Sequence, residues 1–364
     1  MSLLDDQQIV LDQLIDIGRD QKIEAVLIAG DIFDRSVPPA HAVELLDDVI
    51  HRMLSDLKVP IIAITGNHDS PQRLSFASRQ LAASQLHIMG KPSSEPQSVA
   101  LEDKSGKVIV YGIPYTTPNA VRLNLNVDVT SHDEMIAYFA DQIAASHPPQ
   151  HRSVLMGHLF LDGAEESESE RPLSVGGLES VSPKQLSAFN YAALGHLHRP
   201  QWKSKASIRY SGSILKYSFS EHETGKSVSI VDIDQEGQCQ IEQISLRPRR
   251  DVRVIEGKFQ KVLEQGASDP ARDDYLLVRL SDKDAILDIM NRLREVYPNV
   301  LHVERPGLMS RNEHYTLRKD LLKRSELSMF SDFYNQVTSE ELEAEQREYL
   351  EKLLETIHKE EEPG

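Results

Sequence analysis

Several features that mark particular classes of protein are scarce or absent in this sequence. A single cysteine, Cys239, excludes an internal disulfide framework. None of the apolar runs approaches the ~20 residues that a membrane-spanning helix needs, and no basic, apolar leader follows Met1. We therefore expect a soluble protein of a reducing cytoplasm that does not associate with a membrane.

Positive charge is also scarce. Lys and Arg number 40 against 57 Asp and Glu, which gives a formal net charge of −17. This balance argues against a protein that coats nucleic acid nonspecifically, because that mode depends on many basic contacts to phosphates. A nuclease is not excluded, since metal ions can supply positive charge at the one phosphate that is cut.

The length of 364 residues exceeds one typical domain of ~100–200 residues. Residues 251–304 carry a compact pattern of strand (251–256), helix (258–264), strand (275–280), helix (283–296) and strand (300–304). We predict a large domain over 1–246, a small α/β capping domain over 247–306 and a charged helical tail over 307–364. The tail has an apolar stripe that favours binding to a partner helix or coiled coil, formed by Phe330, Phe333, Tyr334 and Val337.

The large domain shows the pattern of an α/β fold. Apolar spacing predicts helices over 4–20 and 40–57, and short apolar runs predict buried strands over 23–29 and 59–65. Further strands are predicted at 108–112, 153–156, 191–194, 207–211 and 227–233. Helices and strands that alternate in this way indicate an α/β architecture.

Four short glycine-led motifs follow strand-like runs. They are Gly30-Asp31-Ile32-Phe33-Asp34, Gly66-Asn67-His68-Asp69, Gly157-His158 and Gly195-His196-Leu197-His198. Imidazole and carboxylate ligands suit Mn, Fe and Zn, and glycine allows the sharp turns through which side chains from several strands converge. Each motif alone is more often a turn or a helix cap, but four in this order predict a shared metal site.

The order of the motifs resembles that of the calcineurin-like metallophosphoesterase superfamily and, within it, the DNA double-strand-break repair nucleases. Three longer segments support the resemblance: Arg171–Gly177, Gly195–Gln201 and Tyr210–Ser218. It covers residues 1 to about 250 and implies a four-layer α-β-β-α sandwich. The region beyond residue 250 resembles the family's capping domain and partner-binding helices through less specific motifs.

The resemblance implies a centre for two divalent metal ions, expected to be Mn²⁺. Asp31 would bridge both ions, Asn67, His158 and His196 would complete one site, and His198 would serve the other. General acid–base catalysis contributes only ~10²–10⁴-fold, so the metals must supply the larger share of the rate.

The resemblance also implies a catalytic pair beside the metals. His68 would act on the scissile phosphate as general acid or charge stabiliser, and Asp69 would hold its imidazole in the working orientation. Asp34 would orient a ligand or contact the substrate, or simply cap the following helix. Arg199 is a further candidate for contact with the substrate or with a ligand.

One family motif has no counterpart here. Family members open with a strand that ends in Asp-x-His, whose side chains complete the site that His198 serves, whereas no histidine precedes Gly30 in this chain. We therefore expect that the first core strand is missing from the sequence as given, as in a truncated gene model. The second metal site is then expected to be incomplete.

The activity that the resemblance implies is hydrolysis of DNA phosphodiesters in replication, recombination and repair. It would combine an ATP-dependent 3′–5′ exonuclease on double strands with an endonuclease on single strands and hairpins. The expected partner is a coiled-coil ATPase, in a heterotetramer built around a homodimer of this chain. Two alternatives remain open: a phosphatase or cyclic-nucleotide phosphodiesterase of the same fold, and a docking subunit that binds DNA and its partner without cutting.

Overall fold

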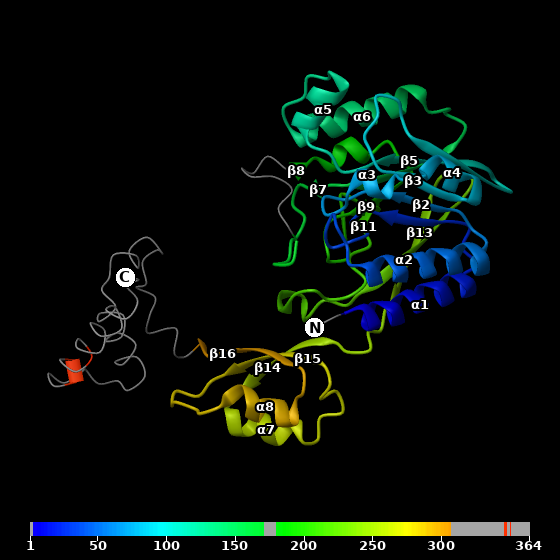
Figure 1. Ribbon diagram of the computed structural model, residues 1–364. Helices are drawn as coiled ribbons and strands as arrows, with labels where there is room; N and C mark the ends of the chain where they lie inside the picture. Colours follow the sequence, from blue (N-terminus) through cyan, green and yellow to red (C-terminus); the bar gives the residue numbers. More distant parts are fainter. Residues whose placement is uncertain (1–2, 171–179, 307–345, 348–349, 351–364) are drawn as a thin grey trace, which may run out of the picture. The chain divides into compact units, whose positions relative to one another are not determined.

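The computed structural model describes residues 3–170, 180–306, 346–347 and 350. The chain divides into two compact units, with the boundary between Arg253 and Val254 (Figure 1). The Arg171–Gly177 motif and the apolar stripe of the tail lie outside the described residues. Within these ranges, no helix has both the length and the apolar character needed to cross a membrane.

The first unit contains a three-stranded parallel sheet in the order β1-β2-β3. Its strands are β1 (Val26–Ala29), β2 (Ile61–Ile64) and β3 (Leu86–Met89). Helices α1 (Leu4–Asp20) and α2 (Ala40–Arg52) pack on one face of it, where Ile15 and Val49 meet Ile61. The helix predicted to reach residue 57 ends in a single π-helical turn, Met53–Leu57, because Lys58 adopts a left-handed conformation.

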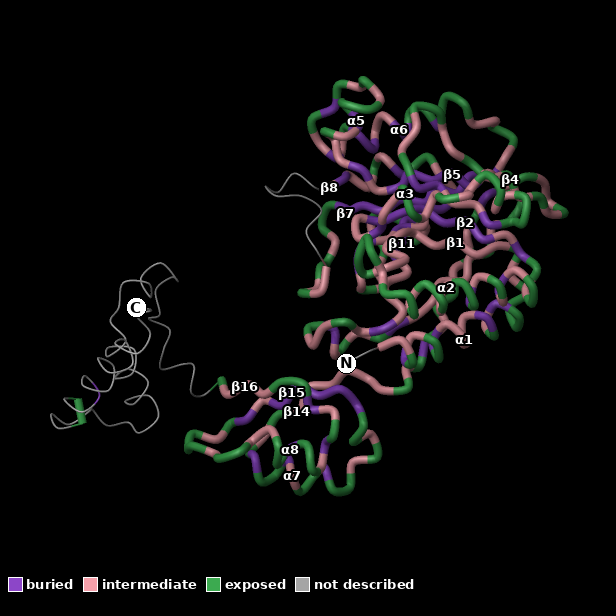
Figure 2. The backbone as a smooth tube through the Cα atoms, in the orientation of Figure 1, coloured by how far each residue is buried: buried purple, intermediate pink, exposed green. Residues whose placement is uncertain are grey.

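The second sheet of this unit has the order β10-β11-β9-β6-β5-β4. The strands are β4 (Ser98–Asp103), β5 (Gly106–Ile113), β6 (Arg152–His158), β9 (Tyr191–Gly195), β10 (Gln201–Lys203) and β11 (Lys205–Tyr210). The central pairs are parallel and the two outer pairs are antiparallel. Strand β6 is buried at every position, as expected for a strand covered on both faces. Figure 2 shows that buried segments gather among the strands of this unit.

The two sheets pack face to face between two layers of helices. Ile62 and Ile64 of β2 share a core with Val154 and Met156 of β6. Because neighbouring strand residues point to opposite faces, Leu155 instead packs in the core formed with the helices on the outer side of the second sheet. Those helices are α5 (Pro118–Leu125) and α6 (His132–Ser146). The predicted four-layer α-β-β-α sandwich is confirmed.

Further helices and strands belong to this unit. They are α3 (Pro71–Leu74), α4 (Ser78–Leu81), β7 (Phe160–Leu161), β8 (Ser180–Val181), β12 (Ser227–Ile233) and β13 (Cys239–Ser245). Strands β12 and β13 form an antiparallel hairpin whose Val231 and Ile241 pack against the core between the two sheets. The hairpin therefore extends the cover of the sandwich.

The second unit has its own sheet, in the order β14-β15-β16, and its own core. Its elements are β14 (Val252–Gly257), α7 (Phe259–Gly266), β15 (Tyr275–Leu280), α8 (Ile289–Val296) and β16 (Val300–Glu304). Helix α8 begins six residues later than predicted. The preceding segment is held as a loop, because Asp282 accepts from the amide of Phe259 and its carbonyl accepts from Arg305.

Candidate metal centre

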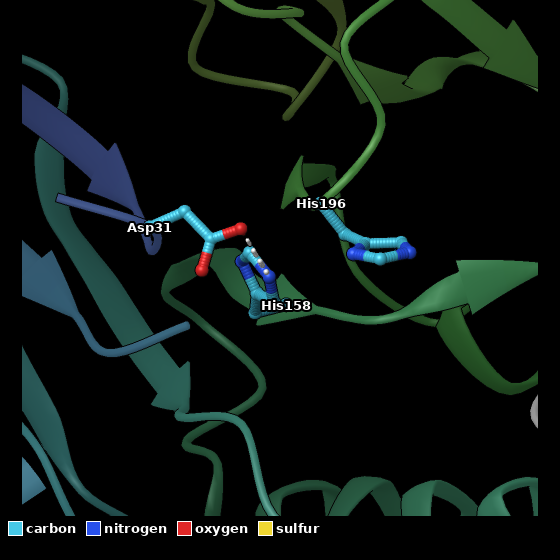
Figure 3. Close-up of side chains that lie close together, drawn as sticks. All are labelled: Asp31, His158 and His196. Atoms are coloured by element: carbon cyan, nitrogen blue, oxygen red, sulfur yellow. Dashed lines mark ion pairs between the residues drawn. The ribbon is translucent and has the colours of Figure 1, made fainter. Parts of the chain in front are cut away.

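Three of the predicted ligands come together at the carboxyl ends of β1, β6 and β9. Asp31, His158 and His196 each offer a ligand atom, and these atoms all lie within 4.8 Å of one another (Figure 3). Asp31 directly follows the turn after β1, His158 ends β6, and His196 follows the last residue of β9. The folding of the sandwich thus brings three distant motifs to one point.

Glycine is required where these strand ends approach one another. A Cβ added to Gly66 would lie 2.1 Å from Oδ1 of Asp31, and one added to Gly195 would lie 1.8 Å from the carbonyl oxygen of Ala29. Both distances are far shorter than any van der Waals contact. The leading glycines of the motifs therefore make room for the ligands.

The hydrogen bonds of His158 determine which of its two ring nitrogens can bind a metal ion. Its Nδ1 lies 2.8 Å from the carbonyl oxygen of Ala29, and because a carbonyl only accepts, Nδ1 must carry the proton. In the neutral ring, Nε2 then presents a lone pair, and it lies 2.9 Å from Oδ1 of Asn67 and 3.3 Å from Oδ2 of Asp31. Three acceptor atoms that face one another in this way fit a bound cation, with nitrogen and oxygen ligands that suit a divalent transition metal.

Electrostatics keep the other two ligands ready for a cation. Burial alone would raise the pKa of Asp31, but a proton on Nε2 of His158, through its hydrogen bond and charge, outweighs burial and holds the pKa at about 2; a bound cation would take the place of that proton. Burial and the nearby charge of His158 lower the pKa of His196 to about 3, so its imidazole is neutral. His196 also has a positive φ of 98°, a strained backbone conformation of the kind that clusters at functional sites.

His68 lies beside this group but is oriented differently from the prediction. Its Nδ1 donates to the carbonyl oxygen of Asp34 at 2.9 Å, and its Nε2 lies 4.0 Å from Oδ2 of Asp31. Asp69 accepts instead from the amides of Ile32, Phe33 and Gly66. The prediction that Asp69 orients the His68 ring was therefore wrong, because its carboxylate ties the two metal-binding loops together.

The side chain of Asp34 is largely exposed, with Oδ1 4.0 Å from Nδ1 of His68. It is 66% exposed and pairs with Arg35 at 3.1 Å, so the backbone carbonyl of Asp34 is the group that holds His68. Arg199 forms an ion pair with Glu165 at the surface. Both side chains are more than half exposed to solvent.

His198 is held by a separate network outside the group of three. Its Nδ1 lies 2.7 Å from Oγ of Ser169 and 3.6 Å from Oε1 of Glu221. Burial alone would raise the pKa of Glu221, but hydrogen bonds with His198, Lys226 and Ser169 hold it at about 2. Sequence reasoning did not find Ser169, Glu221 or Lys226, which lie in polar loops without a glycine-led motif.

Comparison with known proteins agrees with this geometry. The model of the calcineurin-like phosphoesterase family matches residues 5–200, more than half of the chain. The chain therefore belongs to the calcineurin-like phosphoesterases, which makes it a hydrolase of phosphodiester bonds. The fold of this family implies divalent metal binding, and the described residues hold a candidate site in Asp31, His158 and His196.

Longer matches identify the branch of the family. The chain is 30% identical to the D subunit of the nuclease SbcCD of Staphylococcus epidermidis, over 98% of this chain and 94% of the relative. The same identity holds for the D subunit of the nuclease SbcCD of Staphylococcus saprophyticus, over 97% and 93% of the two chains. The chain belongs to the family of these nuclease subunits, which confirms the resemblance seen in the motifs.

Two further matches were found. The model described as the type 5 capsule protein repressor C-terminal domain matches residues 248–338, part of which lies outside the described residues. Among solved structures, a dimetal phosphatase from Danio rerio aligns with 66% of this chain and 88% of its own length, at 11% identity and a TM-score of 0.36.

Proposed function

We propose that this chain is the nuclease subunit of a DNA repair complex and hydrolyses DNA phosphodiesters with two divalent metal ions. The observation that carries the proposal is the near full-length match to proteins named as the D subunit of the nuclease SbcCD. The convergence of Asp31, His158 and His196 supplies the matching chemistry. The proposed reactions are 3′–5′ exonuclease action on double strands and endonuclease action on single strands and hairpins.

The proposed ligands divide between two ions, for which we propose Mn²⁺. Asp31, Asn67, His158 and His196 would hold one ion, and His198 would contribute to the second, whose Asp-x-His ligands have no counterpart in this sequence. When bound, such ions supply a Lewis acid for the phosphate oxygens and activate the attacking water. His68, whose Nε2 faces the Asp31 carboxylate, would donate a proton or a hydrogen bond to the phosphate that is cut.

The proposed partner is an SbcC-type coiled-coil ATPase, because the relatives are named as subunits of an SbcCD nuclease. A partner would also compensate for the net negative charge of this chain. A chain with a net charge of −17 gains little from general electrostatic attraction to DNA. An assembly that contains two copies of this chain and its partner would position the duplex end instead.

The experiment measures cleavage of a linear duplex and of a DNA hairpin by the purified chain, alone and with its co-expressed ATPase partner, in Mn²⁺ and after chelation. We expect cleavage that requires Mn²⁺ and is lost in Asp31→Asn and His158→Gln. An activated phosphodiester such as bis(p-nitrophenyl) phosphate serves as a control for the chemistry of the site. Hydrolysis of that ester without any DNA cleavage, in the presence of the partner, would contradict the nuclease proposal.

A further inference from the structure

The loop that follows β9 is held on every side around His198. The backbone amide of His198 donates to Oε1 of Glu170 at 2.7 Å, and its carbonyl accepts from Nζ of Lys226 at 2.7 Å. The same carbonyl accepts from the amide of Ser213 at 3.1 Å. These three hydrogen bonds therefore hold the backbone of His198 in place without any bound ligand.

The ring of His198 is joined to a buried carboxylate through one hydroxyl group. Nδ1 of His198 lies 2.7 Å from Oγ of Ser169, and the same Oγ donates to Oε1 of Glu221 at 2.6 Å. Ser169 also contacts the hydroxyl of Ser167, but an ionised carboxylate is the stronger acceptor. Because the single hydroxyl proton of Ser169 goes to Glu221, its oxygen can only accept from Nδ1 of His198.

Glu221 is itself held by groups that keep it ionised and fixed. It is 2% exposed, forms an ion pair with Nζ of Lys226, and accepts from the amides of Tyr217 and Ser218, each at 3.1 Å. Lys226 completes its three donors with the carbonyl of His198 and Oγ of Ser213. Lys226 thus supports both the backbone of His198 and the carboxylate behind its ring.

A buried pair of opposite charges costs desolvation and is often no more stable than a well-packed apolar pair. The geometry of the Glu221–Lys226 pair therefore says more about its role than its contribution to stability does. In metal sites, a histidine ligand usually donates its second ring N–H to an oxygen acceptor, and this contact fixes the tautomer. The chain from His198 through Ser169 to Glu221 has this arrangement, with one hydroxyl inserted.

We propose that Ser169 and Glu221, supported by Lys226, are positioning residues that hold His198 as the tautomer protonated at Nδ1, so that Nε2 is the nitrogen offered to a metal ion. The inference deepens the proposed function and rests on it only for the identity of the ligand at Nε2. The tautomer itself is a property of the metal-free protein.

The test uses the full chain labelled with ¹⁵N-histidine, without metal and without DNA. Long-range ¹H–¹⁵N spectra distinguish the two tautomers of each imidazole, and the signals of His198 are assigned by their loss in His198→Gln. We expect the pattern of an Nδ1-protonated ring in the wild type and in Glu223→Gln. Glu223 is the matched control because it lies two residues from Glu221 with an 87% exposed side chain. In Ser169→Ala and Glu221→Gln we expect a mixture of tautomers.

Titration with Mn²⁺, followed by the electron paramagnetic resonance of the free ion, gives the second readout. Loss of a residue that hydrogen-bonds a metal ligand typically lowers metal affinity by ~10–100-fold. We expect this loss of Mn²⁺ affinity in Ser169→Ala and Glu221→Gln, at the same ion whose binding is weakened in His198→Gln. Ser169→Ala removes one partly buried hydroxyl and guards against a Glu221→Gln protein that does not fold. An unchanged tautomer in Ser169→Ala would overturn the inference. An unchanged Mn²⁺ affinity in His198→Gln would instead overturn the proposed role of His198, and the spectra would still decide the tautomer.

Discussion

The Nδ1 atom of His158 donates to the carbonyl oxygen of Ala29 at 2.8 Å, and this bond joins the end of β6 in one sheet to the end of β1 in the other. The two residues are 129 positions apart. The same bond directs Nε2 of His158 toward Asp31 and Asn67. One contact therefore links the packing of the two sheets to the geometry of the metal centre.

Replacement of His158 tests this centre most directly. His158→Gln removes a lone pair directed at the cation, so we expect metal affinity to fall by at least ~100-fold, the upper end of the effect seen for lost outer partners. Metal content after equilibrium dialysis measures this. His87→Gln, at a partly buried histidine on β3, is the control and should leave the metal content unchanged.

The close approach at Gly66 gives a second prediction. Gly66→Ala places a methyl group 2.1 Å from Oδ1 of Asp31, so the carboxylate must move and metal binding should be lost. Gly225→Ala is the matched control, because an added Cβ there meets nothing within 4 Å. Calorimetric titration with Mn²⁺ separates the two variants. Equal affinities for Mn²⁺ would show that Asp31 is not a ligand.

Asp69 is predicted to matter for stability as well as for the site. Hydrogen bonds to charged groups contribute ~1.5–3 kcal/mol each, and Asp69→Asn weakens bonds from three amides, so we expect the free energy of unfolding to fall by about 2–4 kcal/mol. Asp34→Ala should change it by less than about 0.5 kcal/mol, because that side chain is largely exposed. Urea denaturation of both variants measures whether Asp69→Asn loses more stability than Asp34→Ala. Equal losses would indicate that the Asp69 carboxylate does not tie the two loops together.

The ion pair between Arg152 and Asp103 predicts a pH dependence. Arg152, at the start of β6, is buried, and its Nη2 lies 2.5 Å from Oδ1 of Asp103. The hydrogen bonds from Arg152 lower the pKa of the Asp103 carboxyl below its ordinary value of 3.8. Because the folded-state pKa is the lower one, the pair stabilises the fold above pH ~4 and this contribution is lost as the pH falls below it.

The variant Arg152→Met measures the size of that contribution. Removal of one partner of a fully buried pair costs ~3–5 kcal/mol, and because the side chain of Asp103 is 21% exposed we expect Arg152→Met to lose less, about 2–3 kcal/mol at pH 7. The difference from the wild type should narrow as the pH falls from 5 to 2. A difference that stays constant over this range would show that packing, and not charge, accounts for the loss.

The sequence carried clear signals for the strands that bear the ligands. The runs before Gly30, Gly66, Gly157 and Gly195 are short and apolar, and the structure places strands there. Buried strands that end at polar motifs are readable because burial on both faces demands continuous apolar residues. Helices α5 and α6 of the outer layer were not predicted, although the buried residues Met135, Phe139 and Ile143 of α6 recur at helical spacing.

The network around His198 could not be read in the same way. Glu221 and Lys226 lie five residues apart in a polar segment, where charged residues are usually solvated. In the folded chain both are buried, where Lys226 pairs with Glu221 and donates to the carbonyl of His198. The predicted role of Asp69 was wrong for a related reason. Its position next to His68 in the sequence does not determine which backbone amides its carboxylate contacts.

Strand β6 is buried from Arg152 to His158, with the ion pair at its first residue and a ligand at its last. Amide hydrogens in such a strand exchange with solvent only when the whole unit opens. The proposed metal centre is thus anchored to a strand whose amides we expect to exchange slowly, and the position of His158 should persist as long as the domain stays folded.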